Sequence, residues 1–87
     1  MTNIILCGCN GKMGAAVQSF VSQREDCSIA AGVDVSGGSQ GSFPVYTSIS
    51  QVKEAAQVVV DFSHPSALSG ILEYCRQHPG TAAVLCT

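Results

Sequence analysis

The spacing of apolar residues changes along this chain, and the changes predict strands alternating with helices. Residues 3–8 (NIILCG) form a short apolar run closed by glycine, which is typical of a strand buried on both faces of a parallel sheet. From residue 12 to about residue 24, apolar positions recur with helical spacing. The members of this stripe are Met13, Ala16, Val17, Phe20 and Val21.

Residues 28–35 (SIAAGVDV) predict a second strand that ends near Asp34, and the SGGSQGS segment behind it predicts a loop. Residues 43–46 predict a short extended piece. Ser48 or Ser50 is a candidate cap for a brief helix over residues 51–56.

Residues 58–62 (VVVDF) give the clearest strand signal, because three β-branched valines precede turn residues. A helix then follows, with Ser63 or His64 as its cap and Pro65 at its first position. Its predicted apolar stripe consists of Leu68, Ile71, Leu72 and Cys75. Residues 82–86 open a further strand.

Strands that alternate with helices indicate βαβ units, right-handed crossovers and a parallel sheet. We therefore predict one α/β domain over residues 1–87, with helices flanking a parallel sheet. Because the last strand or its exit turn is still forming at Thr87, we expect a truncated domain.

Composition narrows the functional classes. The chain has 87 residues, of which 46% are hydrophobic and 11% charged, which excludes a disordered chain. Its net charge of −2 and its scattered lysines and arginines argue against nucleic-acid binding. No apolar run is long enough for a signal peptide or a membrane span, so we expect a cytoplasmic protein without a membrane partner.

The five cysteines are an odd number and fall mostly in predicted strands and helices, so we interpret them as reduced, buried thiols. Cys7 and Cys9 are spaced like a metal pair, but neither a second pair nor a well-placed histidine completes a four-ligand site. We therefore predict no metal centre.

Three glycines, Gly8, Gly11 and Gly14, follow the first predicted strand and open the first predicted helix. The N–H groups and dipole of a helix N-terminus stabilise an anion such as phosphate. In a Rossmann-like sheet the first glycine permits a sharp turn, the second lets the backbone approach a pyrophosphate, and the third lets helix and sheet pack closely. The spacing here is G-x-x-G-x-x-G rather than the commoner G-x-G-x-x-G. The alternative to a phosphate-binding site is a glycine turn that only packs a helix on a strand.

An acid, Asp34, lies twenty residues beyond Gly14 at the end of the second predicted strand, where a ribose would be held. The alternative for Asp34 is an acid that caps the loop behind it. Because a carboxylate accepts from ribose hydroxyls and repels a 2′-phosphate, we expect NAD as the preferred cofactor. Lys12 leaves NADP use open, since it lies at the start of the phosphate-binding helix.

Ligands of open parallel sheets bind beyond the carboxyl ends of the strands. Phe62, Ser63, Cys86 and Thr87 should therefore line the same crevice as the glycines. We expect Asp61 to hydrogen-bond the turn at its own strand end and His78 to complement a helix C-terminus.

Taken together, GCNGKMG, Asp34 and VDFSHPSAL resemble the N-terminal, cofactor-binding part of the 4-hydroxy-tetrahydrodipicolinate reductase family (dihydrodipicolinate reductase). The terminal VLCT is similar to a family segment that continues into Thr-Gly. The resemblance implies reduction of 4-hydroxy-tetrahydrodipicolinate to tetrahydrodipicolinate by NADH or NADPH, in diaminopimelate and lysine biosynthesis. It further implies that the pyrophosphate lies on Gly8, Cys9, Asn10, Gly11, Lys12 and Met13, the adenosine ribose on Asp34, and the nicotinamide side on Phe62, Ser63, Cys86 and Thr87. Cys86 departs from the glycine often found there.

In the family that this chain resembles, the catalytic histidine and lysine and the substrate-binding sheet belong to a later region. We therefore expect residues 1–87 to be the N-terminal part of the dinucleotide-binding domain, inactive alone. The resemblance implies that a dicarboxylate substrate binds only with the absent domain, which also builds the homotetramer. The alternatives are a non-catalytic nucleotide-sensing Rossmann module and an adenosylmethionine-binding methyltransferase fragment.

Overall fold

The computed structural model describes residues 2–36, 43–63 and 68–85. Its elements, in chain order, are β1 (Thr2–Cys7), α1 (Lys12–Ser22), β2 (Cys27–Val33), β3 (Val45–Tyr46), the 3-10 helix η1 (Ile49–Gln51), β4 (Val58–Asp61), α2 (Leu68–Gln77) and β5 (Ala82–Leu85). The strands pair in parallel, in the order β3-β2-β1-β4-β5. The predicted α/β class and the predicted strands are confirmed, with ends that differ by one or two residues. Residues 86 and 87 lie outside the described part.

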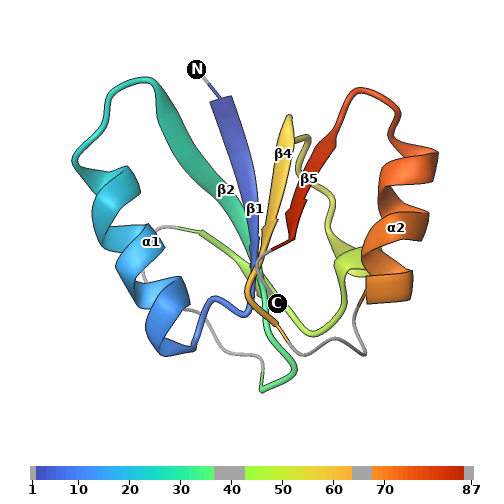
Figure 1. Cartoon of the computed structure of the whole chain (residues 1–87), viewed down its shortest axis with the longest axis horizontal. Coiled ribbons are helices and arrows are strands. Elements are labelled where there is room, and N and C mark those ends of the chain that lie inside the picture. Colours follow the sequence, from blue (N-terminus) through green and yellow to red (C-terminus); the bar gives the residue numbers. More distant parts are fainter. Residues whose placement is uncertain (1, 37–42, 64–67, 86–87) are drawn as a thin grey trace.

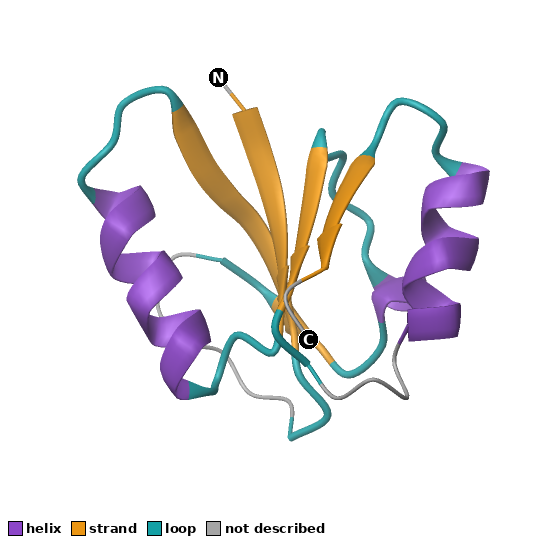
Figure 2. Ribbon diagram, in the orientation of Figure 1, coloured by secondary structure: helices purple, strands orange, loops and turns teal. Residues whose placement is uncertain are grey.

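The strand order reverses direction between β1 and β4, which makes this pair the topological switch point of a Rossmann-like sheet. Figure 1 shows α1 and α2 on opposite faces of the sheet, and Figure 2 shows the same arrangement by element type. The carboxyl ends of the strands meet at one edge, where the β1–α1 connection also lies.

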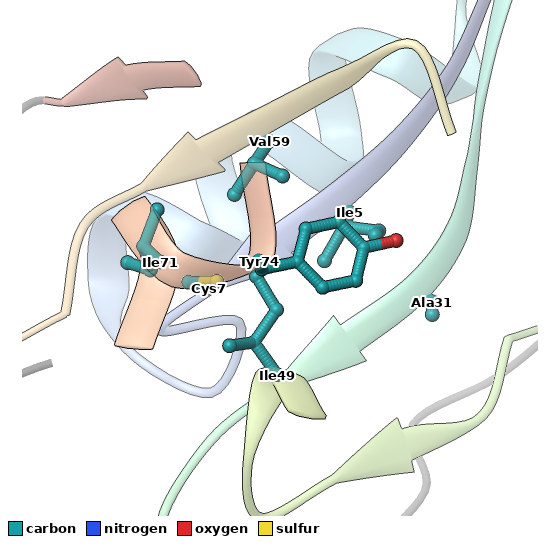
Figure 3. Packing of buried hydrophobic residues seen from close by; sticks show 7 residues of the cluster. All are labelled: Ile5, Cys7, Ala31, Ile49, Val59, Ile71 and Tyr74. Atoms are coloured by element: carbon teal, nitrogen blue, oxygen red, sulfur yellow. The ribbon is translucent and has the colours of Figure 1, made fainter. Parts of the chain in front are cut away.

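Each face of the sheet carries its own apolar cluster, because successive strand residues point to opposite sides. The cluster on the α2 side, drawn in Figure 3, consists of Ile5, Cys7, Ala31, Ile49, Val59, Ile71 and Tyr74. The cluster on the α1 side consists of Leu6, Cys9 and Phe43, with Val17 of α1 packed against it.

The apolar stripe expected on α1 is partly wrong. The buried residues of α1 are Gly14 and Val21, whereas Met13 is 57% exposed and Phe20 is 61% exposed. Gly14 is pressed against the backbone of the β1–α1 turn. This contact turns the Gly14 face of the helix to the sheet and leaves Met13 on the solvent side.

The stripe expected on α2 also needs correction. Ile71 and Tyr74 are the buried residues, while Leu72 is 52% exposed and Leu68 is 37% exposed. Ile71 and Tyr74 are three positions apart and so share the helix face that packs on the sheet. Cys75 packs against the same cluster, as expected.

The brief helix expected over residues 51–56 is shorter and begins earlier. It is η1, Ile49–Gln51, capped by Ser48, whose side chain and that of Gln51 form a capping box. Val52 is extended and ends the turn. The expected cap His64 and the expected first helical residue Pro65 lie outside the described residues.

Two further expectations concern His78 and membrane-spanning segments. A ring nitrogen of His78 lies 2.8 Å from the carbonyl oxygen of Tyr74, at the C-terminal end of α2, as expected. In the described part of the chain, neither helix is long and apolar enough to cross a membrane.

Candidate functional site

The β1–α1 turn requires glycine at its first position. Gly8 has φ +79°, a left-handed conformation that other residues rarely adopt. A Cβ at this position would lie 3.0 Å from the carbonyl carbon of Phe62 and 3.0 Å from the nitrogen of Ser63. The chain can therefore leave β1 sharply and lie against the end of β4 only because Gly8 has no side chain.

The other two glycines of the turn have different surroundings. A Cβ on Gly14 would lie 2.4 Å from the carbonyl oxygen of Gly8 and 2.7 Å from Cα of Cys9, which backbone atoms cannot accommodate. A Cβ on Gly11 would meet only the Gly8 oxygen, at an ordinary 3.5 Å. The fold therefore requires glycine at position 14. Around Gly11, by contrast, the described residues leave room for a ligand.

The N-terminus of α1 is uncapped and carries a lysine. Gly11 is its N-cap, no side chain of the described residues caps it, and its first turn contains no acidic residue. The Gly11 N–H itself donates to the Gly8 carbonyl at 3.2 Å. Lys12 and Met13 are exposed, and Lys12 forms no ion pair with any described residue. The uncapped helix start, the helix dipole and a lysine together favour an anion at this point.

Asp34 follows the last residue of β2 and joins two loops. Its Oδ2 accepts from the Asn10 backbone N–H at 3.0 Å, and its Oδ1 accepts from the N–H and hydroxyl of Ser36 at 3.0 and 2.8 Å. Burial alone would raise the pKa of Asp34, but these hydrogen bonds outweigh it and keep the pKa below its ordinary value. Asp34 is therefore ionised at neutral pH. It does cap the loop behind it, as the alternative interpretation expected, and it also contacts the glycine turn.

Asp61, the last residue of β4, is fully buried. Its Oδ1 accepts from the N–H of Ser63 at 2.8 Å and from the Ser63 hydroxyl, whereas Oδ2 has no hydrogen-bond partner among the described residues. Asp61 thus bonds the turn at its own strand end, as expected. Burial, and secondly the charge of Asp61, raises the pKa of the neighbouring Cys7 thiol to about 12, so this thiol stays protonated.

A cavity of about 380 Å³ opens at the carboxyl edge of the sheet, within the range of about 300–1,000 Å³ typical of small-molecule sites. It reaches from the end of β2 to the start of α2. It is lined by Cys7, Val33, Asp34, Val35, Thr47, Ser48, Ile49, Ser63, Ser69, Gly70 and Ile71.

The structure brings some of the expected site residues together in this cavity and leaves others beside it. Asp34 and Ser63 line the cavity, whereas the glycine turn lies next to it through the bond between Asn10 and Asp34. Phe62 is half-buried against the Leu6 cluster, and its backbone lies beside Gly8. Cys86 and Thr87 lie outside the described residues.

The Cys9 side chain points into the core, and its Sγ donates to Oδ1 of Asn10 in the turn at 3.8 Å. This side chain is 1% exposed and packs with Leu6 and Phe43. Burial, and then the charge of Asp34, raises the pKa of this thiol. Among the described residues, no cluster of histidine, cysteine and acidic side chains could hold a metal ion.

Sequence reasoning missed the η1 side of the cavity, above all Thr47 and Ser48. The rule that ligands gather at the carboxyl ends of parallel strands would have found both residues, because they directly follow β3.

Comparison with known proteins assigns the chain to a family. The family model described as "Dihydrodipicolinate reductase, N-terminus" matches residues 2–87. The chain belongs to this family. The resemblance inferred from GCNGKMG and VDFSHPSAL is thereby confirmed.

Individual relatives agree with this family assignment. Proteins named 4-hydroxy-tetrahydrodipicolinate reductase from Clostridium novyi (strain NT) and Clostridium tetani (strain Massachusetts / E88) are 39% and 41% identical over 87 residues, which is 100% of this chain and 34% of each relative. The solved structure of dipicolinate-bound dihydrodipicolinate reductase from Paenisporosarcina sp. TG-14 shares the fold, with a TM-score of 0.83 and 21% identity. The match covers 100% of this chain and 37% of that one. The chain therefore spans about a third of the length of these relatives.

Proposed function

We propose that this chain is the NAD(P)H-holding part of a 4-hydroxy-tetrahydrodipicolinate reductase. The observation that carries the proposal is the open Gly11 turn at the uncapped N-terminus of α1, next to an ionised Asp34 and a cavity of about 380 Å³. Membership of the reductase family supports the choice of a nicotinamide dinucleotide.

The residues that would hold the cofactor follow from this geometry and from the family resemblance. The pyrophosphate would lie on the turn formed by Gly8, Cys9, Asn10, Gly11, Lys12 and Met13, where backbone donors and the Lys12 ammonium meet it. Asp34 would accept from the adenosine ribose, because a carboxylate has about four acceptor positions and the hydrogen bonds described for Asp34 fill three. Phe62, Ser63, Cys86 and Thr87 would face the nicotinamide side.

We propose NADH as the preferred cofactor. An ionised Asp34 favours ribose hydroxyls and repels a 2′-phosphate, and the residues directly after it are Val35, Ser36 and Gly37 rather than an arginine. Lys12 acts in the opposite direction, since its exposed cation attracts either dinucleotide. We therefore expect a preference for NADH rather than exclusion of NADPH.

The bound cofactor supplies the hydride, and this chain positions the cofactor. The glycine turn fixes the pyrophosphate, and the Asp61 carboxylate holds Ser63 at the switch point. Among the described residues of the cavity, no cationic side chain is available to bind a dicarboxylate. Substrate orientation and proton donation are therefore assigned to other parts of a full-length reductase, and the 87-residue chain alone should not reduce substrate.

Titration calorimetry of the chain with NADH, NADPH and S-adenosylmethionine tests the proposal. We expect both dinucleotides to bind, NADH more tightly, and S-adenosylmethionine not to bind. Asp34→Ala should weaken NADH binding by roughly tenfold, the loss expected for a hydrogen bond to a charged group, and NADPH binding by less.

Three results would contradict parts of this account. Tight S-adenosylmethionine binding without a dinucleotide response would favour a methyltransferase fragment. Failure of a folded chain, checked by circular dichroism, to bind either dinucleotide would refute the cofactor role. A full-length protein that binds NADH and does not reduce substrate would favour the nucleotide-sensing alternative.

A further inference from the structure

The side chains of Asp34, Asn10 and Ser36 form a closed hydrogen-bonded ring between the glycine turn and the loop after β2. Asp34 accepts from the Asn10 backbone and from Ser36, and the Asn10 side-chain amide donates to the Ser36 hydroxyl at 3.0 Å. Two loops that are more than twenty residues apart in sequence are thus joined through one carboxylate. A carboxylate could accept hydrogen bonds from a ribose without such a ring, so the ring points to a second role for Asp34.

The ring acts on the part of the turn that faces the proposed anion site. The base of the turn is held by backbone bonds, from Gly8 N–H to the Val33 carbonyl at 2.7 Å and from Gly11 N–H to the Gly8 carbonyl at 3.2 Å. The bond to Asp34 is made instead by Asn10, directly before the Gly11 N-cap of α1. Because Asp34 is ionised, the hydrogen bond from the Asn10 N–H to its carboxylate is charge-assisted and stronger than a bond between neutral groups.

We propose that Asp34 is also a positioning residue for the anion-binding turn, so that it supports binding of a pyrophosphate group that it does not touch. This inference rests on the proposed dinucleotide function and adds a second role to Asp34. The carboxylate orients Asn10, and through Asn10 it sets the direction of the backbone N–H groups at the start of α1, from Lys12 onward. Ribose and pyrophosphate subsites are then coupled through Asp34.

Charge and geometry give opposite predictions, which makes the inference testable. If Asp34 acts on an anion only through its negative charge, removing it strengthens pyrophosphate binding, because a repulsion is lost. If Asp34 holds the turn in shape, removing it weakens pyrophosphate binding in spite of the lost repulsion. Inorganic pyrophosphate has no ribose, so a direct contact between Asp34 and ribose cannot explain the result.

The experiment measures the Kd of inorganic pyrophosphate and of NADH by calorimetry for the 87-residue chain and three variants. Asp34→Ala and Asp34→Asn remove the same charge, but asparagine keeps one oxygen that can accept from Asn10 or Ser36. We expect Asp34→Ala to weaken pyrophosphate binding at least fivefold and Asp34→Asn to weaken it clearly less. Glu25→Ala is the charge control, because Glu25 is an exposed acid just before the amino end of β2, and it should leave both values unchanged.

Amide hydrogen exchange of the ligand-free proteins supplies a second measurement. We expect faster exchange at Gly11 and Lys12 in Asp34→Ala than in Asp34→Asn, with unchanged protection in β1 and β4. If Asp34→Ala does not fold, the comparison of wild type with Asp34→Asn and Ser36→Ala replaces it, and both should weaken pyrophosphate binding.

The outcomes separate this inference from the function on which it rests. A wild-type chain that binds NADH, together with Asp34→Ala that binds pyrophosphate as well as or better than wild type, overturns the positioning role alone. A folded wild-type chain that binds neither ligand overturns both.

Discussion

Gly11 and Gly14 occupy one turn, yet their missing side chains serve different purposes. Gly14 is buried, and a Cβ there would overlap the backbone of Gly8 and Cys9, whereas a Cβ on Gly11 would make only an ordinary contact with the Gly8 oxygen among the described residues. The fold therefore explains Gly14 but not Gly11, for which we propose a ligand-binding role. Spacing in the sequence predicts both glycines but does not distinguish these roles.

Alanine substitutions should separate the two roles. We expect Gly14→Ala to lower the free energy of unfolding by about 1–3 kcal/mol, as overpacking against atoms that cannot move does. Gly11→Ala should change stability by less than about 1 kcal/mol, because its φ of −83° suits alanine. Gly11→Ala should still weaken NADH binding at least fivefold, since its Cβ enters the proposed pyrophosphate site. Urea unfolding and calorimetry measure these effects, and equal stabilities of the two variants would contradict the assignment.

At the scale of the element, α1 is the least well predicted helix, although its start at Lys12 was predicted correctly. Hydrophobic periodicity predicts Met13 and Phe20 in the core, but the helix buries Gly14 against the β1–α1 turn, and hydrophobic periodicity does not register a glycine. Lys12 at the N-terminus of this helix is also unfavourable for the free protein, because a cation lies at the positive end of the dipole. The proposed anion site would account for this unfavourable charge, which has no ion-pair partner among the described residues.

Lys12→Gln should therefore stabilise the ligand-free protein and weaken its binding of NADH. We expect its free energy of unfolding to rise by about 0.3–1 kcal/mol, the usual size of a charge effect at a helix end. NADH binding should weaken several-fold and depend less on salt. Lys53→Gln, at an exposed position outside the helices, is the matched control and should change neither quantity. A Lys12→Gln variant that is less stable and binds NADH normally would refute this role.

At the scale of the whole molecule, the strand order β3-β2-β1-β4-β5 assembles the candidate site. Because all strands are parallel, Gly8, Asp34, Thr47 and Ser63 come from four separate segments to one edge. The alternation of strands and helices was sufficient to predict this edge, and the glycine turn with Asp34 was sufficient to predict a dinucleotide site on it. The cavity wall at η1 was not predicted, since β3 has only two residues and its periodicity is too short to recognise.

The central claim is that a nicotinamide dinucleotide binds at the glycine turn of this edge. A titration of the 15N-labelled chain with NADH, followed by amide resonances in two-dimensional NMR, tests it most directly. We predict the largest shifts at the backbone amides of residues 8–13, followed by Asp34, Ser36 and Ser63, with little change at the opposite end of the sheet near Arg24 and Asp26. Shifts that gather at the exposed face of α1 around Phe20, or at β5, with the glycine turn unaffected, would contradict the account.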